Sequence, residues 1–590
     1  MDKATNQFAV ECKRRYIATL QGELHKHDGA YEESNLTKDE ITNDYKSFYK
    51  TENKFHMQKM LAPKQPHDNW PARQRSEHNG RQHGRDQDDD DGGQQQQAIT
   101  KKERGVAIAY TTKKMHKGGK SRFISSAGNT ITAKLSLNLT AVFNVLVTDV
   151  HSMWRETASR VSRRSDTGRR ITVDRGMAQA AATSWVTQDA LRIVQLLRAL
   201  NSDRTQPYRR VQRRHRERVF RRTAKWTIQD FTTMYTTLPH DDAVHGLIRR
   251  LGDLIDGIWE FRRRHRKPLH LITRPFPHKG SWEKYEYSDK NDKRQGRLRG
   301  GVEIKGPNTI KRWVAHLVQH CYVQFGRGTF MRQRVGIPMG ESCAGRLAEL
   351  YLFTYEFEFM QRIVARGRWR LARRMLYTRR YIDDTGSFNN SIFNHYKYLP
   401  DDGPPKKDDD GLDENGTYID GIYPKQFLTL NEERPATHDS GIHEGARFLD
   451  LHITTNPRRQ DYVCNVVLPH QDPRPYNSTT PRYPAIDTLL AHRQKYNVVT
   501  AQMYRFDRLC MSMRIFIRHA AGLLYTLCSK GYNQGIILSK MRVYLVTHLA
   551  KRPTNQSAET VMKHIHKHYC ILVVTGGQYH AGHDPNHGHG

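Results

Sequence analysis

The sequence has few cysteines and no Cys-x-x-Cys pair. Its seven cysteines are spread through 590 residues, which argues against a disulfide framework and against a zinc knuckle. Nowhere do 18 apolar residues run together, and the first residues contain no apolar core segment, so we expect neither a membrane span nor a secretion signal. These absences predict an intracellular protein of the nucleus or the cytoplasm that has no membrane partner.

Acidic residues are scarce relative to basic ones. The chain has 96 lysines and arginines against 61 aspartates and glutamates, which gives a formal net charge of +35. A charge of this size creates a long-range field that attracts polyanions, so nucleic acid is the expected partner. A highly charged soluble protein and a binder of anionic membranes are the alternatives. Against the membrane, the sequence has no lipidation signal and its basic residues are spread over several segments.

A chain of this length exceeds a single hydrophobic core, so several structural units are expected. Composition shifts mark their boundaries, because one stretch nearly lacks aliphatic side chains and others are rich in Pro, Gly, Asp or His. The predicted units are an N-terminal polar segment (1–66), a disordered low-complexity linker (67–103), a large mixed domain (104–470) with an acidic surface insertion (400–416), a helical domain (471–572) and a disordered Gly/His tail (573–590).

Apolar residues recur at spacings of three and four in several segments, as amphipathic helices require. An arginine-rich stretch over 208–225 is too basic for a folded interior, and it is either a solvated face or a contact with nucleic acid. The predicted helices cover residues 133–152, 184–200, 509–530 and 534–550.

Two adjacent carboxylates, Asp383 and Asp384, follow Tyr381 in a segment that predicts a strand, an acidic tight turn and a second strand. Like charges held side by side are costly, so such a pair is usually neutralised by a divalent cation or a salt partner. An ordinary Asp-rich β-turn is the alternative.

A third carboxylate, Asp230, lies in a strand-like run that we expect to stop at Pro239. Phosphoryl transfer with two metal ions needs at least two carboxylates that bridge both cations. Asp230 and Asp383 would meet this need. Between them, residues 336–350 read as a turn that leads into a helix.

The three segments resemble motifs A, B and C of reverse transcriptases, in the correct order, and they are most similar to those of the Penelope-like retroelements. The resemblance covers roughly residues 106–570. Its motifs are FTTMYTTLPH from Phe231, GIPMG from Gly336 followed by Cys-Ala, KMHK and RFI from Lys114 and Arg122, IYPKQFLTLN from Ile422, and FLDLHI from Phe448.

The resemblance implies an α+β fold of the right-hand polymerase type, with fingers, a palm built as an antiparallel sheet backed by helices, and a helical thumb over 471–572. Asp230 and Asp383 would bind two Mg²⁺ ions, for which Mn²⁺ could substitute, and Phe231 would add its backbone carbonyl. Asp384 would support the site; because neighbouring strand residues face opposite sides, we expect it to point away. Tyr235 would be the steric gate that favours deoxynucleotides.

The resemblance also implies residues that bind the nucleotide and the primer. Glycines would allow close backbone approach to the incoming base, and basic side chains would hold the triphosphate. The nucleotide-binding residues would be Lys117, Arg122, Tyr235, Gly336, Pro338, Met339 and Gly340, and the primer grip would be Phe448, Leu449, Asp450 and Leu451.

Three positions depart from the family pattern. Gln229 stands where an apolar residue usually precedes the first aspartate, and Lys113 and Gly345 each replace an expected proline. These departures concern the pocket rather than the carboxylates. The sequence also lacks a Gly-Ile-Tyr and Tyr-Ile-Gly endonuclease pair, so we do not expect a nicking activity.

These motifs predict an RNA-directed DNA polymerase of a retroelement, which extends a DNA primer on an RNA template with deoxynucleoside triphosphates. A telomerase-like reverse transcriptase would use the same palm, although we expect the first 100 residues to be too short and too disordered for a telomeric RNA-binding domain. A catalytically inactive, nucleic-acid-binding relic is another alternative, against which all three aspartates argue. Tyr235 argues against an RNA-dependent RNA polymerase.

Overall fold

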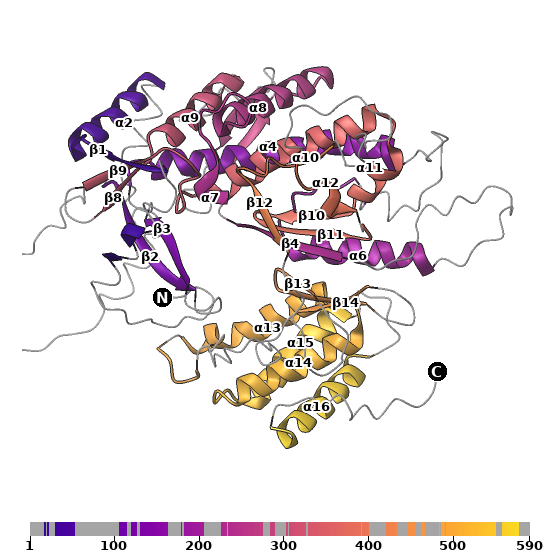
Figure 1. Cartoon of the computed structure of the whole chain (residues 1–590). Helices are drawn as coiled ribbons and strands as arrows, with labels where there is room; N and C mark the ends of the chain where they lie inside the picture. The colour runs from indigo at the N-terminus through magenta and orange to yellow at the C-terminus, as the bar shows by residue number, and fades with distance from the viewer. Residues whose placement is uncertain are drawn as a thin grey trace, which may run out of the picture.

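The computed structural model describes residues 17–18, 20–22, 30–52, 105–114, 120–126, 130–162, 179, 182–205, 226–232, 234–274, 284–288, 303–304, 306–325, 329–390, 392–399, 420–432, 446–455, 462–466, 483, 485–489, 491–549 and 557–576. The predicted linker, the arginine-rich stretch, the acidic insertion and Lys117 lie outside these residues, as does the tail from 577 onward. The fold combines helices and sheets, as the sequence predicts (Figure 1).

A four-stranded antiparallel sheet in the order β10-β11-β4-β12 carries the three aspartates. Its outer edge at β10 is covered by a bridge between Val186 and Arg380, so this edge does not end in open hydrogen-bonding groups. The flanking strands β11 and β12 both come later in the chain than the central strand β4. The strands are β4 (Trp226–Thr232), β10 (Thr378–Tyr381), β11 (Asp384–Phe388) and β12 (Thr429–Glu432).

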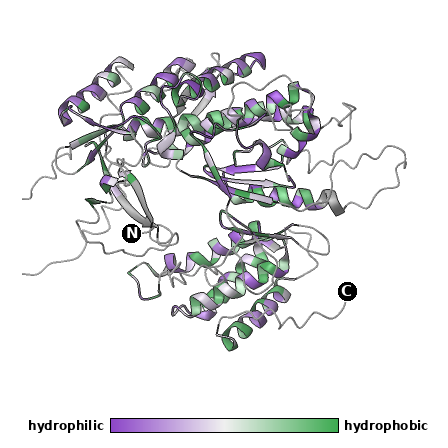
Figure 2. Cartoon of the chain, viewed as in Figure 1, coloured by the Kyte–Doolittle hydropathy of each residue, from purple (hydrophilic) through white to green (hydrophobic). Residues whose placement is uncertain are grey.

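Long helices pack together around this sheet, and their buried apolar side chains belong to the same core as those of the sheet. Helix α10 contacts α4, α8 and α11, and α4 also contacts α9. Figure 2 shows polar and apolar residues alternating along these helices. They are α4 (Ala133–Ser162), α6 (Ala190–Thr205), α8 (Leu247–Arg264), α9 (Pro307–Gln319), α10 (Ala344–Ala365) and α11 (Trp369–Met375), with the one-turn helices α7 (Met234–Thr237) and α12 (Phe393–Tyr396).

Helix α4 is long and apolar enough over Ala133–Val161 to cross a membrane by length and composition. However, side chains on successive turns, such as Leu135, Leu139 and Leu146, are fully buried against other elements of the protein. This burial is typical of a core helix. The helix predicted over 133–152 is confirmed and continues to Ser162 as α4, whereas the helix predicted over 184–200 begins later than expected and is α6, Ala190–Thr205.

A five-stranded sheet, in the order β1-β9-β8-β2-β3, is antiparallel except where β2 runs parallel to β8. Its strand β1 comes from the N-terminal segment, for which we predicted only a polar character. The strands are β1 (Tyr31–Ser34), β2 (Ala107–Lys114), β3 (Lys120–Ser126), β8 (Tyr322–Phe325) and β9 (Thr329–Gln333).

The N-terminal segment also forms α2 (Lys38–Glu52). Ile41, Tyr45 and Tyr49 repeat every four residues along one face of this helix, and all three are buried. The hydroxyl of Tyr49 donates to the carbonyl of Ile131 at 2.8 Å. The segment is therefore integrated into the fold, and the sequence signal was a short aromatic stripe in an otherwise charged stretch.

The remaining strands form two three-stranded sheets. The hairpin β13–β14 of one of them lies between the four-stranded sheet and the C-terminal helices (Figure 1). One sheet has the order β13-β14-β15 and the other β6-β5-β7. The strands are β5 (His270–Arg274), β6 (Lys284–Ser288), β7 (Glu303–Ile304), β13 (Ala446–Phe448), β14 (Leu451–Thr455) and β15 (Tyr462–Val466).

Four helices form the C-terminal part of the described chain. The helix expected over 509–530 is shorter, because Ser512 caps a new start by accepting a hydrogen bond from the N–H of Ile515 at 3.2 Å. Gly531 follows the helix with φ +83°, as expected for a C-terminal glycine. The helices are α13 (His492–Leu509), α14 (Met513–Cys528), α15 (Gln534–Leu549) and α16 (Ala558–Val574), so the predicted helix over 534–550 is confirmed and α16 runs two residues into the predicted tail.

Candidate metal and nucleotide site

The hairpin of β10 and β11 has a two-residue loop, Ile382 and Asp383, so the predicted strand-turn-strand is confirmed. Ile382 has a φ of +56°, which is strained for a β-branched residue and typical of a functional position. The N–H of Phe231 in β4 donates to the carbonyl of Asp383 at 3.0 Å. The loop is therefore tied to the strand that carries the third aspartate.

Arg380 fixes this loop from inside the protein. Its guanidinium is fully buried and donates to the carbonyl of Ile382 at 2.9 Å. It also forms a buried ion pair with Glu356 of α10, whose carboxylate accepts from the hydroxyl of Tyr423 at 2.9 Å. Burial is the largest single influence and would lower the pKa of Arg380, but the charge and hydrogen bond of Glu356, together with Tyr423 and Glu349, outweigh it and raise this pKa above its ordinary value.

The sequence indicated two arginines before the hairpin but not their role. Arg379 is buried as well, and its guanidinium donates to the carbonyls of Leu376 and Thr378 at 3.0 and 2.6 Å. Burial lowers the pKa of Arg379 to about 9. Only a long-range contact distinguishes the two arginines, so sequence reasoning could not find the pair of Arg380 and Glu356.

The three aspartates meet at one end of the four-stranded sheet. One carboxylate oxygen of each of Asp230, Asp383 and Asp384 lies within 4.8 Å of the others. Asp384 is directly opposite Asp230 in neighbouring antiparallel strands, so the two side chains share a face. The expectation that Asp384 points away is wrong. It assumed that Asp383 and Asp384 are neighbours in one strand and so face opposite sides, whereas Asp383 lies in the loop and the strand begins at Asp384.

This set of donors fits a hard divalent cation. Three carboxylate oxygens, two from neighbouring strands and one from the hairpin loop, match the all-oxygen ligands that Mg²⁺ takes in proteins, and the same oxygens suit Mn²⁺. Asp230, Asp383 and Asp384 are therefore the residues of this sheet that could hold a metal ion.

Tyr235 and Gly336 join two of the motifs through their backbones. The strand of motif A ends at Thr232, earlier than the expected end at Pro239, and Tyr235 lies in the one-turn helix α7. Gly336 has a φ of +93°, and a Cβ there would lie 2.2 Å from the carbonyl oxygen of Tyr235. The N–H of Ile337 donates to that same oxygen at 2.9 Å. Only glycine fits this approach.

A second glycine joins the same loop to β3. Gly340 has a φ of +119°, and a Cβ there would lie 1.8 Å from the carbonyl oxygen of Ser125. The N–H of Ser125 donates to the carbonyl of Met339 at 2.9 Å. Pro338 is buried and Met339 is half-buried. Arg122 lies on β3, three residues before Ser125, and the structure describes its backbone only.

One of the three departures from the motif pattern, Gln229, has a structural explanation. Gln229 is buried, and its side-chain amide donates to Oδ1 of Asn394 at 2.6 Å, so one end of this polar group is satisfied. Gly345 faces the hairpin, where a Cβ would lie 3.6 Å from Cδ1 of Ile382, an ordinary contact. Lys113 pairs with Ser121 in the β2–β3 ladder, and its side chain is not among those described.

The predicted primer-grip residues form the β13–β14 turn, where they divide into two pairs. Phe448 and Leu451 are buried, so their side chains support the turn from inside. Leu449 has a φ of +57°, and it lines a pocket of about 570 Å³ together with Asp450 and Tyr381. Of the four residues, only Leu449 and Asp450 can reach a ligand from this turn.

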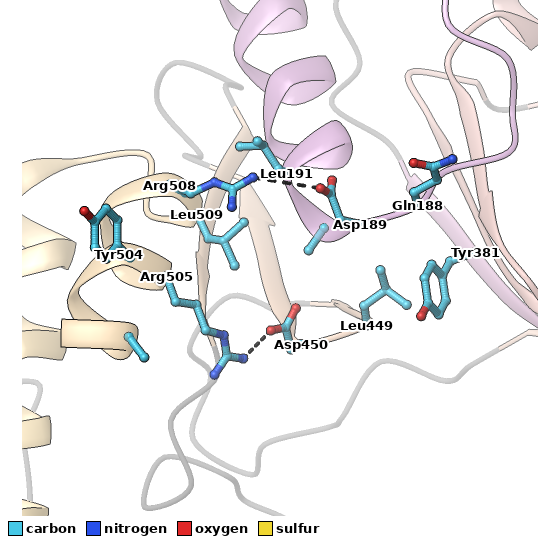
Figure 3. Close-up of a pocket in the computed structure, with 12 residues that line it drawn as sticks. Gln188, Asp189, Leu191, Tyr381, Leu449, Asp450, Tyr504, Arg505, Arg508 and Leu509 are labelled. Atoms are coloured by element: carbon cyan, nitrogen blue, oxygen red, sulfur yellow. Dashed lines mark hydrogen bonds and ion pairs between the residues drawn. The ribbon is translucent and has the colours of Figure 1, made fainter. Parts of the chain in front are cut away.

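Figure 3 shows this pocket between the start of α6, the hairpin and α13. Two ion pairs cross it, one between Arg505 and Asp450 and one between Arg508 and Asp189, the latter at 3.9 Å. The pairs connect α13 to the β13–β14 turn and to α6. The pocket thus lies directly beside Tyr381, the residue that precedes the loop of the three-aspartate site.

No protein-family model matches the sequence, and no curated protein matches it. Among solved structures, the chain is similar to a telomerase from Candida albicans in complex with a TWJ fragment of telomeric RNA, with a TM-score of 0.36 and 9% identity over 81% of this chain and 62% of that chain. It is also similar to an apo telomerase from Candida tropicalis truncated from its C-terminal domain, with a TM-score of 0.30 and 12% identity over 61% of this chain and 54% of that one. The chain thus spans less than two thirds of either.

Proposed function

We propose that this protein is an RNA-directed DNA polymerase of a Penelope-like retroelement, which extends a DNA primer on an RNA template. The observation that carries the proposal is the convergence of Asp230, Asp383 and Asp384 on one end of an antiparallel sheet. Two of them come from one hairpin and the third from the neighbouring strand. The backbone contacts of Tyr235 and Gly336 bring the remaining motifs beside the same strand.

Asp230, Asp383 and Asp384 would hold two Mg²⁺ ions, with Mn²⁺ as a substitute. Bound there, the ions would lower the pKa of the primer 3′-hydroxyl and neutralise the charge that develops on the pyrophosphate. The buried pair of Arg380 and Glu356 positions the loop, because Arg380 holds the carbonyl of Ile382. Because the carboxylates are already held in position, they would need little rearrangement to reach the transition state.

The residues around Gly336 and Gly340 would form the nucleotide pocket. The two glycines bring Tyr235 and β3 against the loop that precedes α10, so the nucleotide would be enclosed by segments from motif A, motif B and β3. The ring of Tyr235 would occupy the space of a ribose 2′-hydroxyl and so select deoxynucleotides. Arg122 of β3, with Lys117 before it, would contact the triphosphate.

In this proposal the four-stranded sheet is the palm of a right-hand polymerase. The five-stranded sheet that carries Arg122 would belong to the fingers, and helices α13–α16 would be the thumb. Leu449 and Asp450 at the β13–β14 turn would contact the primer strand, beside the pocket next to Tyr381. The net charge of +35 suits the phosphate backbones of both template and primer.

Primer extension tests the proposal directly. The purified chain, with a DNA primer annealed to an RNA template, Mg²⁺ and deoxynucleoside triphosphates, should lengthen the primer. Asp383→Asn keeps the shape of the side chain but removes a charged ligand. Because metal stabilisation of the transition state contributes several kcal/mol, we expect a rate loss on the order of 10³-fold.

The matched control is Asp253→Asn on α8. Asp253 is exposed and lies in an ordinary i,i+4 pair with Arg249, so this variant should extend primers at the wild-type rate. Equal activity of Asp383→Asn and the wild type would refute the proposal. Binding of nucleic acid without extension in the wild type would instead favour an inactive relic.

A further inference from the structure

Helices α2 and α9 pack against each other through a stack of aromatic rings. The imidazole of His316 is parallel to the ring of Phe48, with centroids 3.7 Å apart and an interplanar angle of 2°. The ring of Tyr45 meets His316 edge-on at 4.7 Å. Two rings from α2 therefore fix the orientation of one imidazole of α9. None of these residues takes part in the three-aspartate site.

A second histidine and a carboxylate lie next to this imidazole. His316 and His320 are four residues apart, so they share one face at the end of α9. Nδ1 of His320 lies 2.8 Å from Oδ2 of Asp44 on α2. One ring nitrogen of each histidine and one oxygen of Asp44 all lie within 4.8 Å of one another. Three potential metal ligands thus converge from two helices.

The environment of His316 indicates a missing ligand. Its side chain is about nine-tenths buried, yet its Nε2 has no hydrogen-bond partner among the described residues. A buried polar atom without a partner is costly, and native proteins rarely leave one without a reason such as an ion. Because the rings of Tyr45 and Phe48 hold His316 in place, the nitrogen cannot turn freely to another acceptor or donor.

We propose that Asp44, His316 and His320 bind one Zn²⁺ ion. Two imidazoles and one carboxylate are a common zinc ligand set, and two histidines at i and i+4 on a helix can reach one ion. The rings of His316 and His320 are stacked, with centroids 4.4 Å apart, so the partly exposed His320 would turn its ring to share the ion with His316. Two nitrogen donors disfavour Mg²⁺, which prefers oxygen. The fourth position is left for water, since Asp44 and His320 are partly exposed.

The ion would fasten the N-terminal segment to the rest of the chain. The hydroxyl of Tyr45 already donates to the carbonyl of His320 at 2.5 Å, next to the site. Strand β1, which precedes α2, pairs with β9 and so forms the edge of the five-stranded sheet. Zinc bound between α2 and α9 therefore stabilises the sheet whose other edge carries Arg122. This role does not depend on the proposed polymerase function.

Zinc binding is measured on the full chain after removal of metals with a chelator. The protein is dialysed against Zn²⁺ in a large excess of Mg²⁺, so that the oxygen-rich three-aspartate site is occupied by Mg²⁺, and bound zinc is counted by mass spectrometry. Because the chain has 31 histidines, the readout is the difference between the wild type and its variants. Co²⁺ replaces Zn²⁺ in a parallel experiment, since its visible absorption reports coordination.

Two variants remove ligands while they keep the packing. His316→Phe retains a ring that stacks on Phe48, and Asp44→Asn retains the shape of the carboxylate. The control is His265→Gln, which changes an exposed histidine that lies 3.3 Å from Glu156 and is far from the cluster in sequence. We expect the wild type and His265→Gln to bind one zinc more per chain than either ligand variant.

We also expect zinc to raise the melting temperature of the wild type but not of the two ligand variants. Loss of one zinc and of the Co²⁺ absorption in both His316→Phe and Asp44→Asn supports the proposal. Equal zinc counts in all four proteins overturn it. Circular dichroism checks that each variant folds; if His316→Phe does not, Asp44→Asn and the melting temperature of the wild type with and without zinc decide the question.

Discussion

The buried pair of Arg380 and Glu356 should be essential both for stability and for the site. Both side chains are fully buried, and Arg380 also donates to the carbonyls of Ile382 and Glu349, each at 2.9 Å. Glu356→Leu leaves the guanidinium charged in the interior without its counterion. Removing one partner of a buried pair costs about 3–5 kcal/mol. The free energy of unfolding should fall by that amount.

The measurement is urea denaturation followed by circular dichroism, using the first transition of the chain. With a slope of about 2–3 kcal/mol/M, the midpoint of Glu356→Leu should shift downward by roughly 1–2.5 M. Asp253→Asn provides the matched exposed pair, because Arg249 and Asp253 have side chains that are 62% and 71% exposed. It should cost about 0–1 kcal/mol.

The double variant Arg380→Met with Glu356→Leu separates stability from activity. An apolar pair of similar volume often replaces a buried ion pair without loss, so most of the stability should return. Primer extension should not return, because Ile382 then lacks the donor that fixes its strained loop. A cost below about 1 kcal/mol for Glu356→Leu would refute the reasoning, since it would mean that water reaches and screens the pair.

Three further predictions concern other positions. Gly340→Ala should lower the free energy of unfolding by more than about 1 kcal/mol and weaken nucleotide binding, because the new Cβ meets the carbonyl of Ser125. The control Gly257→Ala, where a Cβ has no atom within 4 Å, should raise the free energy of unfolding by about 0.5–1 kcal/mol, and urea denaturation compares the two variants. Tyr235→Ala should lose its preference for deoxynucleotides over ribonucleotides in primer extension, and an unchanged preference would exclude the steric gate. Burial lowers the pKa of His151 from 6.5 to about 4, so the unfolded chain binds a proton more readily than the folded one. The free energy of unfolding should therefore fall as the pH drops from 6.5 toward 4. In His151→Gln, urea midpoints measured across this range should depend less on pH.

Local sequence signals were sufficient for the elements that carry the motifs. The paired aspartates after Tyr381 predicted a hairpin, and the turn before Ala344 predicted the start of a helix, because both depend on residues adjacent in the chain. The glycines of the loop were predicted to allow close approach to an incoming base, which stays a prediction; their approach to the carbonyls of Tyr235 and Ser125 is a long-range contact that only the structure gives. The hairpin and the start of the helix need no knowledge of distant contacts.

Features set by register or by long-range contacts could not be predicted in this way. The face of Asp384 depends on its pairing with Asp230, and the counterion of Arg380 comes from a helix. The residues after Thr232 favour a strand, but they form the one-turn helix α7. The carbonyl of Tyr235 in this helix accepts a hydrogen bond from the N–H of Ile337, next to Gly336. In each case tertiary contacts outweigh local preference.

The position of β4 in its sheet has a consequence for how the protein is made. Its two neighbours, β11 and β12, both follow it in the chain, so β4 leaves the ribosome well before either partner exists. Until then its backbone groups are unpaired on both sides, a state that favours intermolecular strand pairing. Chains that stop before Glu432 should therefore aggregate, and nascent chains should need protection by chaperones while the segment between β4 and β12 is synthesised.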